Sequence, residues 1–155
     1  MQAHTAVEKF AECKSLAVKV HAYVSEASIQ GHATDRDLHG LPEYAAELAE
    51  RNDRTTLMAL GREVDRWLRE VHEPSEALLL IANMRSRGVR ESELPVLASA
   101  KRLLAVVTRG SIKSKSEAEL VQSILANEEL AKLLGARALE LNATLTKWHI
   151  GRACS

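Results

Sequence analysis

Apolar positions repeat at helical intervals along most of the chain. Near the start they alternate every three and four residues, the spacing of a helix that packs along a neighbouring helix. Most of these side chains are small, so the neighbour can come close, and it can belong to this chain or to a second copy. Because free cysteine is usually buried, we expect a packed thiol at the cysteine of this stripe. The stripe is Ala3, Ala6, Phe10, Cys13, Ala17, Val20, Val24 and Ala27.

Prolines, glycines and capping residues divide the rest of the sequence into further helices. The fourth and fifth are apolar nearly all round, which predicts that they lie at the centre of a bundle. The helices expected after the first run from Pro42 to about Asn52, from a cap at Asn52 or Asp53 through Val71, from Pro74 to Arg87, from a cap at Ser92 to Arg109, from a capping box at Ser116 and Glu119, and from a cap at Asn127 through Trp148.

Two pairs of opposite charge are spaced four residues apart on the third of these helices. They are Asp65 with Arg69 and Arg66 with Glu70. We expect each pair to add a few tenths of a kcal/mol, roughly, to the helix.

Composition agrees with an all-α fold. Seven glycines, three prolines and five aromatic residues among 155 describe a helical chain, since strands favour aromatic and β-branched residues. The length suits one domain, so we predict a single-domain bundle of six to seven helices over residues 1–155. Two cysteines provide no disulfide framework, and no apolar run approaches the ~18 residues that span a bilayer. We expect a soluble, cytoplasmic protein that does not enter a membrane.

Charge is divided unevenly between the two halves, although the net charge is zero. Residues 1–83 carry nine Lys/Arg against fourteen Asp/Glu, and residues 84–155 carry twelve against seven. Such asymmetry indicates a charged partner or head-to-tail association. The oligomeric state stays open.

A basic stretch in the second half is the strongest functional feature. Its arginines near helix C-termini can simply complement the helix dipole, whereas the lysines before the sixth helix are not explained in that way. Basic clusters attract phosphates or acidic protein surfaces. The predicted partner-binding or nucleic-acid-binding residues are Arg85, Arg87, Arg90, Lys101, Arg102, Arg109, Lys113 and Lys115.

Signs of enzymatic chemistry are few. The loop between Gly31 and Gly40 holds His32, Asp35, Asp37 and His39, and imidazole with carboxylate suits zinc, iron or manganese. However, the spacing fits no HExxH or Glu-x-x-His pattern, and the chain has no GxSxG motif or phosphate-binding glycine loop. We therefore expect a non-enzymatic protein without a cofactor, and a metal-dependent helical enzyme is a further alternative.

Two short segments near the C-terminus resemble a helix-turn-helix unit. Residues 127–135 are similar to its first helix and turn, and residues 144–152 to the end of the recognition helix in phage-repressor and excisionase-type proteins. The resemblance covers about 26 residues and implies a regulator that reads DNA with Lys147 and Arg152. Its Gly135-to-Trp148 gap of thirteen residues exceeds the usual nine or so, and one continuous helix explains the spacing better.

Together these patterns favour a non-enzymatic accessory or adaptor protein of bacterial or phage type. It would dock through its basic C-terminal half onto a nucleoprotein complex or an acidic protein surface. A DNA-binding transcriptional regulator is the alternative that the helix-turn-helix resemblance implies.

Overall fold

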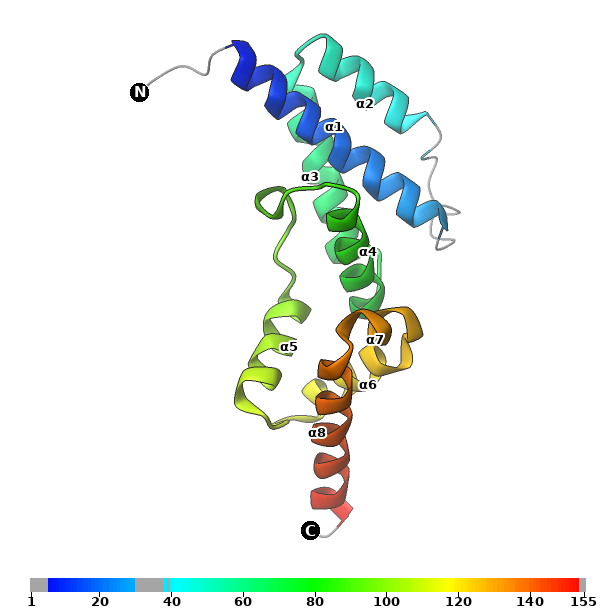
Figure 1. The fold of residues 1–155 in the computed structure, drawn as a ribbon, viewed down its shortest axis with the longest axis vertical. Coiled ribbons are helices and arrows are strands. Elements are labelled where there is room, and N and C mark those ends of the chain that lie inside the picture. The colour runs from blue at the N-terminus through cyan, green and yellow to red at the C-terminus, as the bar shows by residue number, and fades with distance from the viewer. Residues whose placement is uncertain (1–5, 30–37, 39, 154–155) are drawn as a thin grey trace, which may run out of the picture. The chain divides into compact units, whose positions relative to one another are not determined.

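All regular structure in the described part of the chain is helical (Figure 1). A computed structural model describes residues 6–29, 38 and 40–153. The all-α class is confirmed, and these ranges hold eight α-helices and one short 3₁₀ helix where six to seven helices were predicted. None of the eight combines the length and the apolar character needed to cross a membrane. The helices are α1 (Ala6–Ile29), α2 (Leu41–Glu50), α3 (Arg54–Glu70), α4 (Pro74–Ser86), η1 (Glu91–Glu93), α5 (Ala98–Arg109), α6 (Lys115–Ala126), α7 (Glu128–Leu134) and α8 (Ala136–Ala153).

Two compact units share the chain. Unit 1 comprises Met1–Val71 and Leu80–Pro95, and unit 2 comprises His72–Leu79 and Val96–Ser155. Helix α4 therefore begins in unit 2 and ends in unit 1. The single domain over residues 1–155 stays a prediction.

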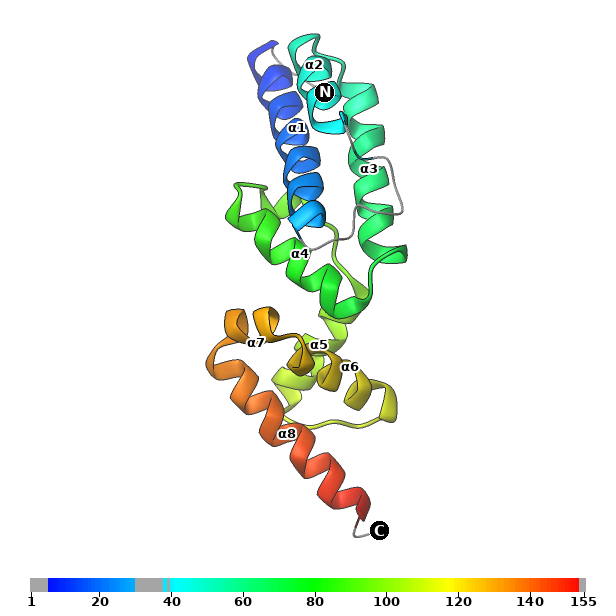
Figure 2. The same cartoon turned by 90° about the vertical axis from the view of Figure 1, so that its right-hand side faces the viewer.

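Unit 1 is built on α1, which packs against α2 and α3 (Figure 2). Cys13, Val20 and Ala27 have no exposed surface, so this part of the small-residue stripe predicted for the first helix faces neighbours within its own unit, whereas Phe10 is 39% exposed. Burial raises the pKa of the Cys13 thiol, and the nearby Glu12 carboxylate raises it further. The expectation of a packed thiol is confirmed.

A buried ion pair links α1 to α3. Lys19 retains 4% of its exposed surface, and its Nζ lies 2.7 Å from Oδ1 of Asp65. The predicted pairing of Asp65 with Arg69 is therefore wrong, because the carboxylate bonds to another helix. The predicted pairing of Arg66 with Glu70 is confirmed at 3.5 Å.

The fifth helix is shorter and less central than the sequence indicated. The residue before a proline avoids the helical region, and Leu94, which precedes Pro95, is extended, as is Leu97. Helix α5 consequently begins at Ala98. Only Val106 is buried among its residues, and Leu104 is 62% exposed, so its predicted place at the centre of a bundle is wrong.

Unit 2 is organised around α6, which packs against α5, α7 and α8. Its larger core cluster joins Val106 of α5, Val121 of α6, and Leu141 and Leu145 of α8. The single continuous helix expected from Asn127 through Trp148 is wrong. Gly135 has φ 58° and ψ −123°, a conformation that glycine adopts most readily, and it separates α7 from α8.

Candidate functional site

The eight basic residues predicted as a binding surface divide between the two units. Arg85, Arg87 and Arg90 belong to unit 1. Each is ion-paired to a carboxylate of the same unit, so its charge is already balanced within the chain. The pairs are Arg85 with Glu91 at 2.6 Å, Arg87 with the buried Glu26 at 3.5 Å, and Arg90 with Glu93 at 3.0 Å.

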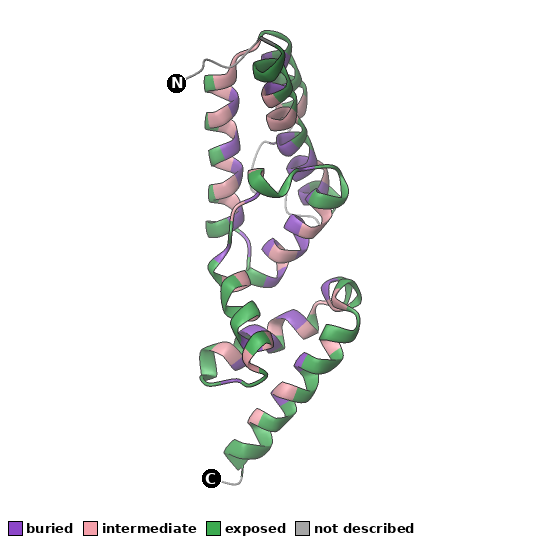
Figure 3. Cartoon of the chain, turned by 60° about the vertical axis from the view of Figure 1, so that its left-hand side comes forward, coloured by how far each residue is buried: buried purple, intermediate pink, exposed green. Residues whose placement is uncertain are grey.

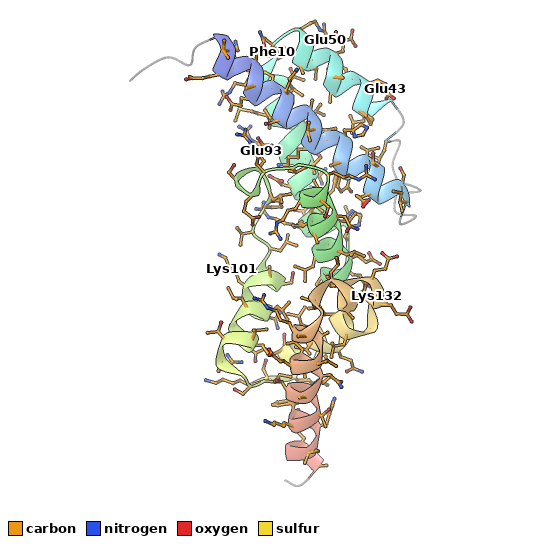
Figure 4. All side chains as sticks on the ribbon, in the orientation of Figure 1. Phe10, Glu43, Glu50, Glu93, Lys101 and Lys132 are labelled. Atoms are coloured by element: carbon orange, nitrogen blue, oxygen red, sulfur yellow. The ribbon has the colours of Figure 1, made fainter. Side chains whose placement is uncertain are left out.

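The other five lie in unit 2, on α5, in the α5–α6 turn and at the start of α6. Arg109 is ion-paired to Glu117. The remaining four are exposed, and across the described ranges none of them is ion-paired to a carboxylate. They are Lys101 (labelled in Figure 4), Arg102, Lys113 and Lys115.

Glu117 organises the turn between α5 and α6. Its carboxylate accepts hydrogen bonds from the Lys113 backbone N–H at 2.8 Å and from the Arg109 guanidinium. Arg109 also donates to the carbonyl of Ser111. On the adjacent turn, Arg102 donates to the hydroxyl of Ser116. These bonds hold the start of α6 against Arg102 and Arg109 of α5.

The helix cap at this corner also differs from the expectation. Ser114 caps α6 by accepting from the Glu117 N–H at 3.2 Å, whereas Ser116 was predicted to form the capping box. Asn127 caps α7 as the sequence indicated, and of the two predicted alternatives for α3, Asn52 and Asp53, the cap is Asp53.

The bond from Lys113 and the charge of Arg109 lower the pKa of Glu117 below its ordinary value of 4.5. Because its folded-state pKa is depressed, ionised Glu117 stabilises unit 2 above about pH 4.5, and this contribution is lost as the pH falls through the folded-state pKa. We expect Glu117→Gln to destabilise unit 2 at neutral pH and to lose that difference from wild type in acid. Urea unfolding followed by Trp148 fluorescence in a Trp67→Phe background measures this. The exposed Glu119→Gln is the control, and an equal effect of both substitutions would contradict the assignment.

A groove of about 420 Å³ lies beside this corner, between the α5–α6 turn and α8. The turn contributes Gly110, Ser111 and Ile112. Gly110 has φ 74°, the left-handed conformation that ends α5, so the chain reverses there. The wall from α8 consists of Thr144, Lys147, Trp148, Gly151 and Arg152.

The α8 wall combines two cations with an indole. The Arg152 guanidinium lies over the Trp148 ring, 5.2 Å from its centroid, which holds the cation in place. Lys147 is exposed, and in the ranges that the structure describes it has no carboxylate partner. Leu141 and Leu145, buried on the same helix, fix how α8 presents these side chains.

We use the name cationic surface of unit 2 for the exposed cations of α5, the α5–α6 turn, the start of α6 and the groove wall of α8. It comprises Lys101, Arg102, Lys113 and Lys115 with the groove residues Lys147 and Arg152. The segment from Ser111 to Lys113 runs from the groove to the α5–α6 corner and so connects the two parts. Sequence reasoning missed the groove residues Ser111 and Thr144, because the groove exists only once α8 packs beside the turn.

The first alternative to the cationic surface is the metal site predicted in the loop between Gly31 and Gly40. His32, Asp35, Asp37 and His39 lie outside the described residues, so the metal hypothesis stays a prediction. Within the described ranges, no group of three or more His, Cys, Asp or Glu side chains could hold a metal ion.

The helix-turn-helix resemblance depends on how α7 and α8 are joined. A helix-turn-helix joins its helices by a three- to four-residue turn, whereas Gly135 alone separates α7 from the 18-residue α8. The DNA-reading alternative remains a prediction.

Comparison with protein-family models, with curated proteins and with solved structures gives no match. A function for the chain therefore has to be inferred from the chemistry of its own residues.

Proposed function

We propose that the chain is a non-enzymatic accessory or adaptor protein that docks onto a nucleoprotein complex. Contact is made by the cationic surface of unit 2, which meets the phosphate backbone of the nucleic acid. The three paired arginines of unit 1 take no part, because Glu91, Glu26 and Glu93 already balance their charges.

The observation that carries this proposal is the difference in pairing between the two parts of the basic stretch, one in each unit. In unit 1 the arginines of the basic stretch are neutralised by the chain's own carboxylates. In unit 2, Lys101, Arg102, Lys113 and Lys115 are exposed without an acidic partner in the described ranges. Cations that are not neutralised internally are free to bind an external anion and to release its counterions.

The kinds of side chain on this surface favour phosphate over an acidic protein surface. Lysine, arginine and hydroxyl side chains with backbone N–H groups make most protein contacts to phosphate oxygens. Ser111 brings a hydroxyl into the same groove as Lys147 and Arg152, whereas the hydroxyl of Thr144 already donates to the carbonyl of Glu140. The ring of Trp148 already packs beneath Arg152 and against the core cluster, so it supports the guanidinium rather than an incoming base.

A pull-down with and without nuclease tests this function. We expect the tagged protein to capture a nucleoprotein complex from its native host, and nuclease treatment to release most of the captured material. If nuclease treatment leaves capture of the same partner unchanged, the chain docks onto an acidic protein surface and not onto nucleic acid. Capture of nothing above a tag-only control would contradict an adaptor role.

A further inference from the structure

Helix α8 carries a second apolar face, which points away from the core of unit 2. The face that contains Leu141, Leu145 and Trp148 packs into the core. On the opposite side, a stripe repeats at three- and four-residue intervals, and Figure 3 shows mostly exposed positions along this C-terminal helix. The stripe, which we call the outer stripe, is Ala136, Leu139, Ala143, Thr146, Ile150 and Ala153.

The outer stripe has the composition of a helix-pairing seam. Leu139 is 74% exposed and Ile150 is 59% exposed, although isolated large apolar side chains would gain from burial. Thr146 donates its hydroxyl to the carbonyl of Asn142 at 2.9 Å, so its methyl group can serve an apolar seam. Alternating three- and four-residue spacing is the pattern by which one helix packs along another.

Charged side chains beside the outer stripe indicate which partner helix, and in which orientation, can pack against it. Glu140 and Lys147 lie on the same side of α8, two turns apart, and neither has an ion-pair partner in the described part of the chain. In a second α8 running antiparallel, the lysine of each copy lies beside the glutamate of the other. In the same register, Leu139 of each copy packs against Ile150 of the other, and Ala143 of each copy packs against Thr146 of the other. A parallel copy would not bring the opposite charges together.

We propose that α8 pairs with α8 of a second copy of this chain, antiparallel and about a two-fold axis. The interface is self-complementary, as a two-fold contact requires. Each copy contributes one 18-residue helix, about 27 Å long, to the interface. The area that two such helices bury is small for a protein interface. We therefore expect a monomer–dimer equilibrium in the micromolar range.

The pairing has a consequence for binding. Lys147 lines the groove as well as flanking the stripe, so pairing with Glu140 of the other copy removes this cation from phosphate binding in the dimer. In an antiparallel pair, equivalent flanks of the two helices lie on the same side. Two grooves would then open on one side of the dimer, so that a dimer could contact a long polyanion at two places.

Sedimentation equilibrium on nucleic-acid-free protein tests the pairing independently of nucleic-acid binding. Wild type should show a concentration-dependent dimer, and Ile150→Glu should remain monomeric. Leu104→Glu is the matched control, since Leu104 is 62% exposed on α5 and lies outside the stripe; it should dimerise as wild type does. A wild-type chain that stays monomeric into the high micromolar range, or equal loss in both variants, would overturn the proposal.

Charge exchange tests the antiparallel register. Lys147→Glu should weaken dimerisation about tenfold, because it turns two attractive pairs into repulsive ones. The double variant Glu140→Lys/Lys147→Glu should restore it, since the exchanged charges again meet their opposites. Both changes are on the surface and leave the core of unit 2 intact. Failure of the double variant to regain dimerisation would exclude this register.

Discussion

The triple variant Arg102→Glu/Lys113→Glu/Lys115→Glu should lose nucleic-acid binding by about 100-fold or more at fixed salt. Each of these side chains is exposed and lacks a carboxylate partner in the described ranges, so each is available for a phosphate. Reversal replaces three attractions by repulsions and removes the counterion release that accompanied them. Fluorescence anisotropy with a labelled duplex measures the loss. Capture of the native nucleoprotein complex should disappear with it.

A matched variant in unit 1 controls for the change in net charge. Lys14→Glu/Arg62→Glu/Arg69→Glu reverses three exposed cations of α1 and α3 and alters the net charge by the same amount. We expect it to bind almost as wild type does. If the two triple variants lose affinity equally, binding depends on overall charge and not on the cationic surface of unit 2.

Local disruption has to be distinguished from lost contact in the triple variant. Arg102 donates to Ser116, and its charge helps to hold Glu117 ionised. Arg109 and the Lys113 backbone N–H still bind Glu117 after the three changes, so the corner keeps its main hydrogen bonds. Unchanged helical circular dichroism at the assay temperature and a cooperative melting transition would confirm that the variant is folded.

The second large effect concerns stability and centres on the buried pair of Lys19 and Asp65. Lys19→Met should destabilise unit 1 by about 2–3 kcal/mol, because Asp65 keeps its charge and loses its partner. The figure lies below that for a fully buried pair, since the Asp65 side chain retains 24% exposure. Urea unfolding followed by Trp67 fluorescence in a Trp148→Phe background reports on unit 1 alone.

Replacing both partners provides the decisive comparison. Lys19→Met/Asp65→Leu should recover to within about 1 kcal/mol of wild type, because a buried ion pair contributes little beyond an apolar pair of similar size. Arg66→Met removes the exposed partner of both Glu63 and Glu70 and should leave unfolding almost unchanged. Wild-type stability in the Lys19→Met variant would contradict this prediction, because it would show that water alone solvates the charge of Asp65 sufficiently.

Local signals explain the features that the sequence predicted correctly. Asp53 and Asn127 cap helices because their side chains reach a backbone N–H three residues ahead. The helical repeat predicts much of the buried face of α1, although Phe10 within the stripe is exposed and Lys19 and Tyr23 outside it are buried. The all-α class follows from the same repeat.

Local signals failed where two alternatives satisfy the same pattern. Ser114 and Ser116 are each followed three residues later by a glutamate, so either could cap α6. In the folded chain Ser114 is the cap, and the glutamate three residues after it, Glu117, accepts hydrogen bonds from Lys113 and Arg109. Pro95 fits a first helical turn as well as an extended segment. Gly135 could interrupt a helix or lie within one, and in the folded chain its backbone conformation ends α7.

The binding surface itself was predictable only in part. The sequence identified the basic stretch, but it could not show that Glu26, distant along the chain, neutralises Arg87. Asp65 likewise bonds to Lys19 on another helix in preference to Arg69 on its own. The groove requires α8 to pack beside the α5–α6 turn, and no spacing along the chain encodes that contact.

The salt dependence of nucleic-acid binding measures whether the cationic surface of unit 2 contacts phosphate. The logarithm of affinity should fall linearly with the logarithm of salt concentration, and the slope should be shallower by about three for the Arg102/Lys113/Lys115 triple variant than for wild type. Duplexes of scrambled sequence should bind as tightly as duplexes of sequence taken from the native host. Discrimination between the two would favour the DNA-reading alternative. Identical slopes for wild type and the triple variant, or no binding of wild type to any nucleic acid at low salt, would contradict the account.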